Sequence, residues 1–139
     1  MTQYTFAMLK PDATESNILA MAMDYFEEDG LEIAALKMTQ LTKEQAEKFY
    51  AIHRERPFFN DLVAFMISGP VVLMVLKGDE AVARARAVIG ATNPDDAEEG
   101  TIRGDLSESI DKNTVHGSDS EENAKTEIAF FFTKEEIVK

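Results

Sequence analysis

The chain contains no cysteine among its 139 residues. Disulfides, thiolate nucleophiles and cysteine-bound metals are therefore excluded. No apolar stretch approaches the length of a membrane span, and the N-terminus, MTQYTFAMLKPD, lacks a basic segment followed by an apolar run. These absences favour a cytoplasmic protein without a membrane partner.

Positive charge is also scarce, because 14 lysines and arginines stand against 26 aspartates and glutamates, for a formal net charge of -12. The field around so acidic a protein repels polyanions, so we expect no nucleic-acid partner. The common phosphate-binding loops, GxxxxGK[ST] and GxGxxG, are absent as well. A phosphate-bearing ligand would have to be held by a local cluster of basic side chains.

The apolar content limits the number of domains. With 45% hydrophobic residues, a chain of this length can bury one core and is too short for two ordinary domains, so we expect residues 1–139 to form a single domain. Four short apolar runs are typical of strands: Tyr4–Leu9, Glu32–Met38, Val71–Leu76 and Glu127–Phe132. The third run, VVLMVL, is apolar at consecutive positions, which favours a central strand covered on both faces.

Between the expected strands, the apolar residues recur at helical spacing. Residues 18–26 predict one helix, with Gly30 as the glycine that follows its C-terminus. Thr42 and Gln45 have the spacing of a capping box at the start of a second helix. Two further helices are expected, one starting at Pro57 and one capped by Asp79.

Residues 91–112 have no periodicity, and such a long connection is uncommon in a compact domain unless it is functional. Helical segments that connect sheet strands are typical of an α+β fold. The order of elements predicts a ferredoxin-like (split βαβ) sandwich, with a four-stranded, mainly antiparallel sheet and helices packed on one face.

His116 is one of only two histidines and lies in the stretch NTVHGSDS. An imidazole can be a nucleophile, a general base or a metal ligand, although a single histidine in a loop is more often structural or exposed. Gly117 allows the backbone to pass close to a ligand. The residues Ser118 to Ser120 can begin a short helix whose amides favour an anion, and they would serve equally well in an ordinary cap.

A metal site would require the other histidine, His53, to converge with His116, and the chain has neither HExxH nor HxH spacing. His53 shares a helical face with Tyr50, so we expect it to be half-buried. Three basic residues next to turns could be ordinary ion-pair partners in so acidic a protein; they are Lys10, Arg86 and Arg103.

Six blocks of sequence together resemble the nucleoside diphosphate kinase family. They occur in the family's order and spacing over almost the whole chain: KPDA at 10–13, FYAIHRERPFF at 49–59, SGPVV at 68–72, GATNP at 90–94, GTIRGD at 100–105 and NTVHGSDSEENA at 113–124. The NxxHGSDS block is highly specific. This resemblance implies a kinase that transfers the γ-phosphate of a nucleoside triphosphate, typically ATP, to a nucleoside diphosphate.

The resemblance also implies how the transfer takes place. His116 would carry the phosphate as a phosphohistidine in a ping-pong mechanism. Glu127, expected at the start of the last strand, resembles the glutamate that holds the other imidazole nitrogen, and Ser118 and Ser120 flank the same network. The implied catalytic residues are His116, Glu127, Lys10, Tyr50, Ser118 and Ser120.

The implied nucleotide contacts follow from the same blocks. The positions that match phosphate contacts are Lys10, Tyr50, Arg86, Thr92 and Arg103, with Arg56 nearby. The positions that match the two sides of the base are Phe58, Leu62 and Ile110. Lys10 and Asn113 match the positions that reach the ribose. A base held by stacking is read weakly, so broad base and sugar tolerance is implied. Without the resemblance, Phe58 and Leu62 would be read as core residues. Mg²⁺ is implied as a bridge between phosphate oxygens, held mainly by the nucleotide and not by a protein metal site.

One segment departs from the family pattern. After KPDA the chain reads TESNILAMAMDYF, which is acidic and has no glycine, where the family usually has a glycine-containing and often basic stretch. Larger residues there put helix packing or a subunit contact in doubt. The family forms dimers, tetramers or hexamers, so a homo-oligomer is implied.

Two other functions are compatible with these motifs. The first is a non-catalytic nucleotide-binding or regulatory module, because a fold does not fix a function. The second is a phosphocarrier that passes its phosphate to another protein. Nucleotide binding without phosphate exchange would favour the first, and transfer of label from His116 to a protein would favour the second.

Overall fold

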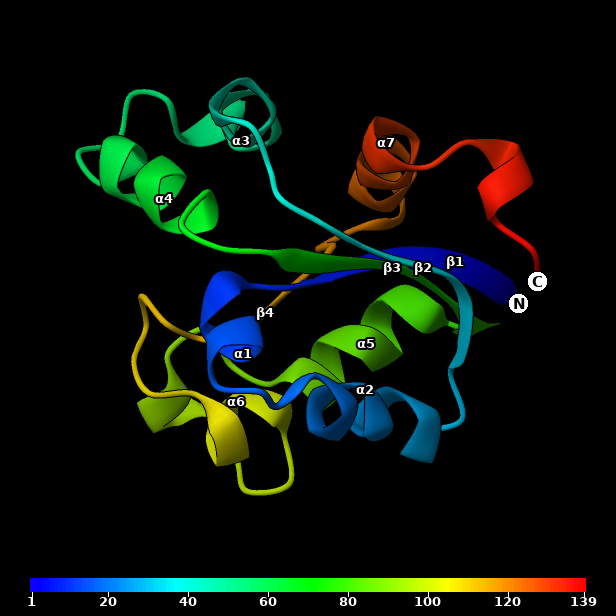
Figure 1. Cartoon of the computed structure of the whole chain (residues 1–139). Helices are drawn as coiled ribbons and strands as arrows, with labels where there is room; N and C mark the ends of the chain where they lie inside the picture. The colour runs from blue at the N-terminus through cyan, green and yellow to red at the C-terminus, as the bar shows by residue number, and fades with distance from the viewer.

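The computed structural model describes all 139 residues and is built on a four-stranded antiparallel sheet (Figure 1). Its strands are β1 (Thr2–Leu9), β2 (Glu32–Thr39), β3 (Val71–Asp79) and β4 (Val115–Gly117), in the spatial order β2-β3-β1-β4. Both β1 and β2 pair antiparallel with β3, so they run in the same direction with β3 between them. This arrangement is the expected split βαβ topology.

Helices cover both faces of the sheet (Figure 1). One face carries α1 (Pro11–Glu15), α2 (Leu19–Glu28), α5 (Ala81–Ile89) and α6 (Ile102–Leu106), and the other carries α3 (Lys43–Phe49), α4 (Phe59–Met66) and α7 (Glu121–Phe131). The prediction of helices on one face is therefore wrong. Alternate residues of the central strands enter two separate cores, with Phe6 and Leu73 in one and Ala7 and Met74 in the other. Strands that are apolar at consecutive positions need cover on both sides.

The central position expected for the VVLMVL run is confirmed, because all residues from Val71 to Leu76 are buried in β3 between two neighbouring strands. The strand expected at Glu127–Phe132 is wrong, because these residues belong mainly to α7. Ser120 begins this helix by accepting a hydrogen bond from the Asn123 N–H at 3.0 Å. Ala124, Ile128 and Phe131 then face the sheet at helical spacing, and the apolar triplet at its end imitated a strand.

Two of the other predicted helix boundaries are confirmed, and one is wrong. Thr42 and Gln45 form the expected capping box of α3, and α2 is followed by Gly30 at a φ of +91°. Asp79 does not cap α5: it ends β3 and binds the Met1 amino group at 2.9 Å, while the residue before α5 is Glu80. Glu80 has a left-handed backbone, with φ of 50°, and its side chain makes no capping hydrogen bond.

The aperiodic stretch 91–112 contains two short helical turns, namely η2 (Pro94–Asp96) and α6. Two further turns follow α3 and α7, namely η1 (Ala51–His53) and η3 (Lys134–Glu136). All helices fall short of the length and apolar content that a membrane crossing requires.

Candidate active site

A cleft of about 860 Å³ opens at the end of the sheet where β1 meets β4. Its walls are α4 with the turn before it on one side, and the segment 110–113 on the other. Eleven of the residues expected at the site line it: Lys10, Tyr50, Phe58, Leu62, Arg86, Thr92, Arg103, Ile110, Asn113, His116 and Glu127. Ser118, Ser120 and Arg56 are not among its lining residues. The fold therefore gathers side chains from most of the chain into one concave site.

His116 lies on β4, where it pairs with Met8 of β1, and a hydrogen-bond chain orients its ring. Its Nε2 lies 3.0 Å from Oε1 of Glu127, and the Ser118 hydroxyl donates to the same oxygen at 2.6 Å. An ionised carboxylate can only accept hydrogen bonds. Nε2 therefore carries the proton of the neutral ring, and Nδ1 retains its lone pair. Glu127 reaches the ring from α7, not from a strand, and this corrects its expected location.

An aromatic cluster that sequence reasoning missed surrounds the imidazole. The Phe49 ring packs edge-on against His116 with centroids 5.2 Å apart, and Phe6 and Tyr50 lie at 6.0 Å and 6.4 Å. These rings restrict the imidazole to the orientation that Glu127 selects. Phe49 precedes Tyr50 in the quoted motif, so its place in the block was the available signal.

The basic residues of the cleft form a positive cluster. None of Lys10, Arg86 and Arg103 is in an ion pair, so the interpretation of these residues as ordinary ion-pair partners is wrong. The Arg103 side chain is buried and donates to the carbonyl oxygens of Gly90 at 3.2 Å and Val115 at 2.8 Å. Burial, and then the charge of Arg86, lowers the pKa of Arg103 to about 10.

Lys10 lies at the end of β1 and donates from Nζ to Oδ1 of Asn113 at 2.8 Å. Burial lowers the pKa of Lys10 to about 8, and the nearby Arg103 charge adds to this effect. Bringing two positive groups together out of water is unfavourable, and the arrangement is relieved by an anion. The cluster is therefore suited to bind phosphate despite the net charge of the protein.

Tyr50 follows α3 and presents a buried hydroxyl with no hydrogen-bond partner in the chain. Burial raises the pKa of this phenol, and the neighbouring Glu127 raises it further. The phenol therefore remains neutral and can donate to a ligand in the cleft. An unpaired buried hydroxyl is costly, which is typical of a group that is satisfied by a ligand.

The opposite end of the cleft is apolar. Phe58 and Ile110 are 48% and 54% exposed, and Leu62 lines the same cleft. Phe58 therefore lies outside the core, whereas its neighbour Phe59 is buried there. The half-buried His53 packs on Phe58 with ring centroids 5.5 Å apart. A flat aromatic ligand could be held between these surfaces.

The two serines of the HGSDS stretch have different positions. Ser118 is buried and bonds Glu127, whereas Ser120 caps α7. The chain holds no group of three histidine, aspartate or glutamate side chains arranged to bind a metal.

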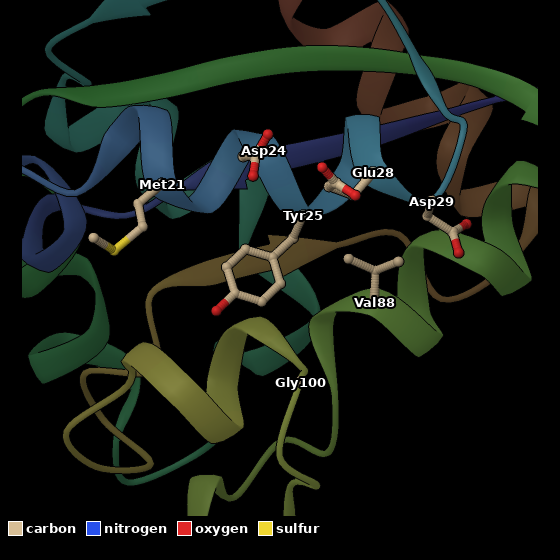
Figure 2. Close-up of a pocket in the computed structure, with 7 residues that line it drawn as sticks. All are labelled: Met21, Asp24, Tyr25, Glu28, Asp29, Val88 and Gly100. Atoms are coloured by element: carbon tan, nitrogen blue, oxygen red, sulfur yellow. The ribbon is translucent and has the colours of Figure 1, made fainter.

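A second, smaller hollow of about 480 Å³ lies between α2, α5 and the segment at Gly100 (Figure 2). Asp24, Glu28 and Asp29 extend their carboxylates around it, beside Tyr25 (Figure 2). This acidic lining would repel a phosphate group. Of the two sites, only the larger cleft is lined by lysine and arginine side chains, which a phosphate group requires.

Comparisons with known proteins agree with this geometry. The sequence model of the family "Nucleoside diphosphate kinase" matches residues 3–137. The nucleoside diphosphate kinase of Rhizorhabdus wittichii is 61% identical over 137 residues, covering 99% of this chain and 98% of that protein. The Campylobacter jejuni enzyme of the same name is 60% identical over 133 residues, covering 96% and 97%.

Solved structures give the same result. The crystal structure of the Aquifex aeolicus nucleoside diphosphate kinase is similar, with a TM-score of 0.96 and 45% identity, over 99% of this chain and 100% of that one. The structure from Encephalitozoon cuniculi has a TM-score of 0.93 and 42% identity, over 96% and 91%.

Proposed function

The chain belongs to the nucleoside diphosphate kinase family and is an enzyme of that kind, and we propose that it carries the phosphoryl group on Nδ1 of His116. One observation supports this assignment above all. In the cleft, Glu127 occupies Nε2 of His116 and leaves Nδ1 with a free lone pair. A protein that only bound nucleotides would not need a nucleophile held in a fixed orientation.

The proposed reaction has two mirrored steps. The lone pair on Nδ1 attacks the γ-phosphorus of the donor, and the bond to the bridging oxygen breaks, so the nucleoside diphosphate leaves with that electron pair. A terminal oxygen of the acceptor diphosphate then attacks the phosphohistidine, and the N–P bond breaks back to the imidazole. The Nε2–H remains on the ring throughout, and the Glu127 carboxylate stabilises the positive charge that develops there.

The other residues of the cleft would position and stabilise the transferring group. In phosphoryl transfer, charge spreads over the equatorial oxygens, and catalysis is mostly positioning and electrostatic stabilisation. Lys10, Arg86 and Arg103 supply positive charge, and the free hydroxyl of Tyr50 supplies a donor. Thr92, which also lines the cleft, would complete the phosphate contacts.

The base would lie between Phe58 and Ile110 with Leu62 behind, and the ribose would lie near Asn113 and Lys10. Because the base contacts are stacking and apolar, they would accept any base. We expect both ribose and deoxyribose to be accepted as well.

Mg²⁺ would enter with the nucleotide, be held mainly by it, and neutralise negative charge during transfer. The lining fits this arrangement, since Asp61, Asp111 and Asp119 offer oxygen donors in the cleft, and no three such side chains converge into a metal site of the protein itself.

The test is to mix the protein with γ-labelled ATP and Mg²⁺, isolate it, and chase it with several unlabelled nucleoside diphosphates. We expect acid-labile, base-stable label that moves to all acceptors and that is absent from His116→Ala. Label that moves to another protein in preference to nucleotides would indicate a phosphocarrier instead. Full turnover by a folded His116→Ala would overturn the proposal.

Residues 1–139 would act as one kinase domain, and we further propose that it assembles as a homo-oligomer. Leu36 and Met38 are 51% and 58% exposed on β2, which is an edge strand of the sheet. An edge strand with exposed apolar side chains is a template for pairing with another copy. Sedimentation velocity should give a mass above that of the monomer for the native chain, and Met38→Asp should lower it; a monomeric native chain would refute the proposal.

A further inference from the structure

The segment that precedes His116 contains an unfavourable backbone conformation. Thr114 has a φ of 75°, in the left-handed region, and it is buried. A β-branched residue is rarely found there, because its side chain crowds the backbone. Such a conformation persists only where the surroundings hold it in place.

Each polar group of Thr114 has a partner. Its N–H donates to Oδ2 of Asp12 at 3.0 Å, and its carbonyl oxygen accepts from the Lys10 N–H at 2.9 Å. Its hydroxyl lies 2.7 Å from the Ser107 hydroxyl. The N–H of Thr114 therefore depends on one side chain, that of Asp12, which lies 102 positions away in the sequence.

The residues on either side of Thr114 belong to the active site. Asn113 accepts from Lys10 Nζ through its side chain and donates to the Thr92 carbonyl oxygen at 3.1 Å. His116 lies two residues after Thr114. A rotation of the backbone at Thr114 would change the distance between the Asn113 end of the cleft and the nucleophile.

We propose that Asp12 is a positioning residue, whose carboxylate holds Thr114 in its left-handed conformation and so fixes Asn113 relative to His116. Asp12 does not line the cleft, so it acts through Thr114 and not on the nucleotide. The inference rests on the proposed role of His116.

The Asp12 carboxyl lies in an unfavourable environment, and this supports a specific role for it. Its Oδ1 is buried and has no partner in the chain, and burial raises the pKa of the carboxyl even though the Thr114 N–H favours its charged form. An under-satisfied buried carboxylate is unfavourable. Packing alone would be served as well by an apolar side chain.

The proposal predicts a difference between two substitutions. Asp12→Asn keeps an oxygen that can accept from the Thr114 N–H, whereas Asp12→Ala removes it. Because small displacements of reacting groups can slow a reaction about 100-fold, we expect Asp12→Ala to slow phosphorylation of His116 at saturating ATP by about 10- to 100-fold. Asp12→Asn should remain within about threefold of the native rate, since the hydrogen bond is retained. Equal losses in both variants would overturn the proposal.

A double variant isolates the mechanism. Glycine adopts the left-handed conformation without strain, so Thr114→Gly removes the need for a side chain that holds it. Asp12→Ala should then cost less than about fivefold in the Thr114→Gly background, because the two effects are coupled. The same loss in both backgrounds would show that Asp12 acts in some other way. If Asp12→Ala alone folds poorly, the double variant is compared with Thr114→Gly itself: a rate within about fivefold supports the proposal, and a larger loss overturns it.

The charge of Asp12 can be tested by a second measurement, the pH profile of kcat/KM. A loss of packing alone would not shift this profile. Lys10 faces Arg103, Asp12 and Asp111, and Asp12 itself faces Lys10 and Glu108. The negative charge of Asp12 favours protonated Lys10. Both substitutions of Asp12 should therefore move the alkaline fall of kcat/KM to lower pH, while Arg84→Ala, which removes a contact to Asp29 away from the cleft, should leave it in place. An unmoved profile in both Asp12 variants would contradict the proposal.

These experiments distinguish a failure of the positioning role of Asp12 from a failure of the phosphohistidine assignment. If His116→Ala retains turnover, the assignment fails whatever the Asp12 variants do. If His116→Ala is inactive and the Asp12 variants match the native enzyme, only the positioning role fails.

Discussion

Replacing Glu127 by glutamine tests how the cleft activates its histidine. The Nε2–Oε1 contact is 3.0 Å long, and the two side chains are 22% and 20% exposed, so solvent screens it only in part. A hydrogen bond to a charged group contributes about 1.5–3 kcal/mol, against about 0.5–1.5 kcal/mol for a neutral one. Glu127→Gln should therefore raise the barrier by about 1–2 kcal/mol and slow phosphorylation about 5- to 30-fold.

In the Glu127→Gln variant, the amide oxygen would remain toward His116, because the Ser118 hydroxyl must also donate to it. Glu127→Ala removes this acceptor for both donors and should slow the reaction at least about 100-fold, since unpaired buried groups are costly. Rapid-quench measurement of phosphoenzyme formation at saturating ATP gives both rates. Glu122→Gln, an exposed position on the same helix, serves as the control. Equal rates for the native enzyme and Glu127→Gln would refute this account of the carboxylate.

Three further predictions concern other parts of the site. Because the pKa of Lys10 is lowered to about 8, kcat/KM should fall as pH rises through that value and the ammonium loses its proton; a Lys10→Gln variant that keeps this fall in its pH profile would contradict the assignment. Phe58→Ala should raise KM for every nucleotide by about 5- to 150-fold, since stacking contributes about 1–3 kcal/mol per base, and an effect on one base alone in competition assays would exclude simple stacking. Ser120→Ala should lower the free energy of unfolding by about 1 kcal/mol, because the cap of α7 is lost. The phosphorylation rate should change little. A large loss of rate at native stability would instead place Ser120 in the catalytic network.

Much of the fold follows from local sequence patterns. The apolar runs in β1, β2 and β3 are long enough to be recognised, and the Thr42 capping box marked a helix start correctly. β4 covers only Val115–Gly117, and a pattern of three residues has no measurable period. Phe130 and Phe131 pack against Phe49 from the end of α7, and together with Phe132 they form an apolar triplet that imitates a strand.

In the site too, some residues could be predicted from local motifs, whereas others depend on how distant segments pack together. Motif residues that are far apart in sequence line one cleft, although composition alone would not have selected Ile110 or Thr92. The packing of Phe49 and Phe6 around His116 depends on how α3 and β1 meet, which no local pattern specifies. The contact between Asp12 and Thr114 likewise exists only once β1 and β4 are paired.

The distribution of charge explains how an acidic protein can bind a polyanion. The chain carries a net charge of -12, and the smaller hollow has three carboxylates around it. Lys10, Arg86 and Arg103 are nevertheless gathered in the larger cleft, and none of them forms an ion pair. Nucleotide binding should therefore be governed by this local potential and not by the net charge of the whole protein.

The most direct test of the central claim is the kinetic competence of the phosphohistidine. In a quench-flow experiment, labelled ATP and Mg²⁺ are mixed with the enzyme, and the phosphoenzyme is then mixed with a nucleoside diphosphate. The proposed mechanism predicts that label appears on His116, and leaves it, at rates no slower than steady-state turnover. A phosphoenzyme that forms or discharges more slowly than turnover would show that the phosphate reaches the acceptor by another route.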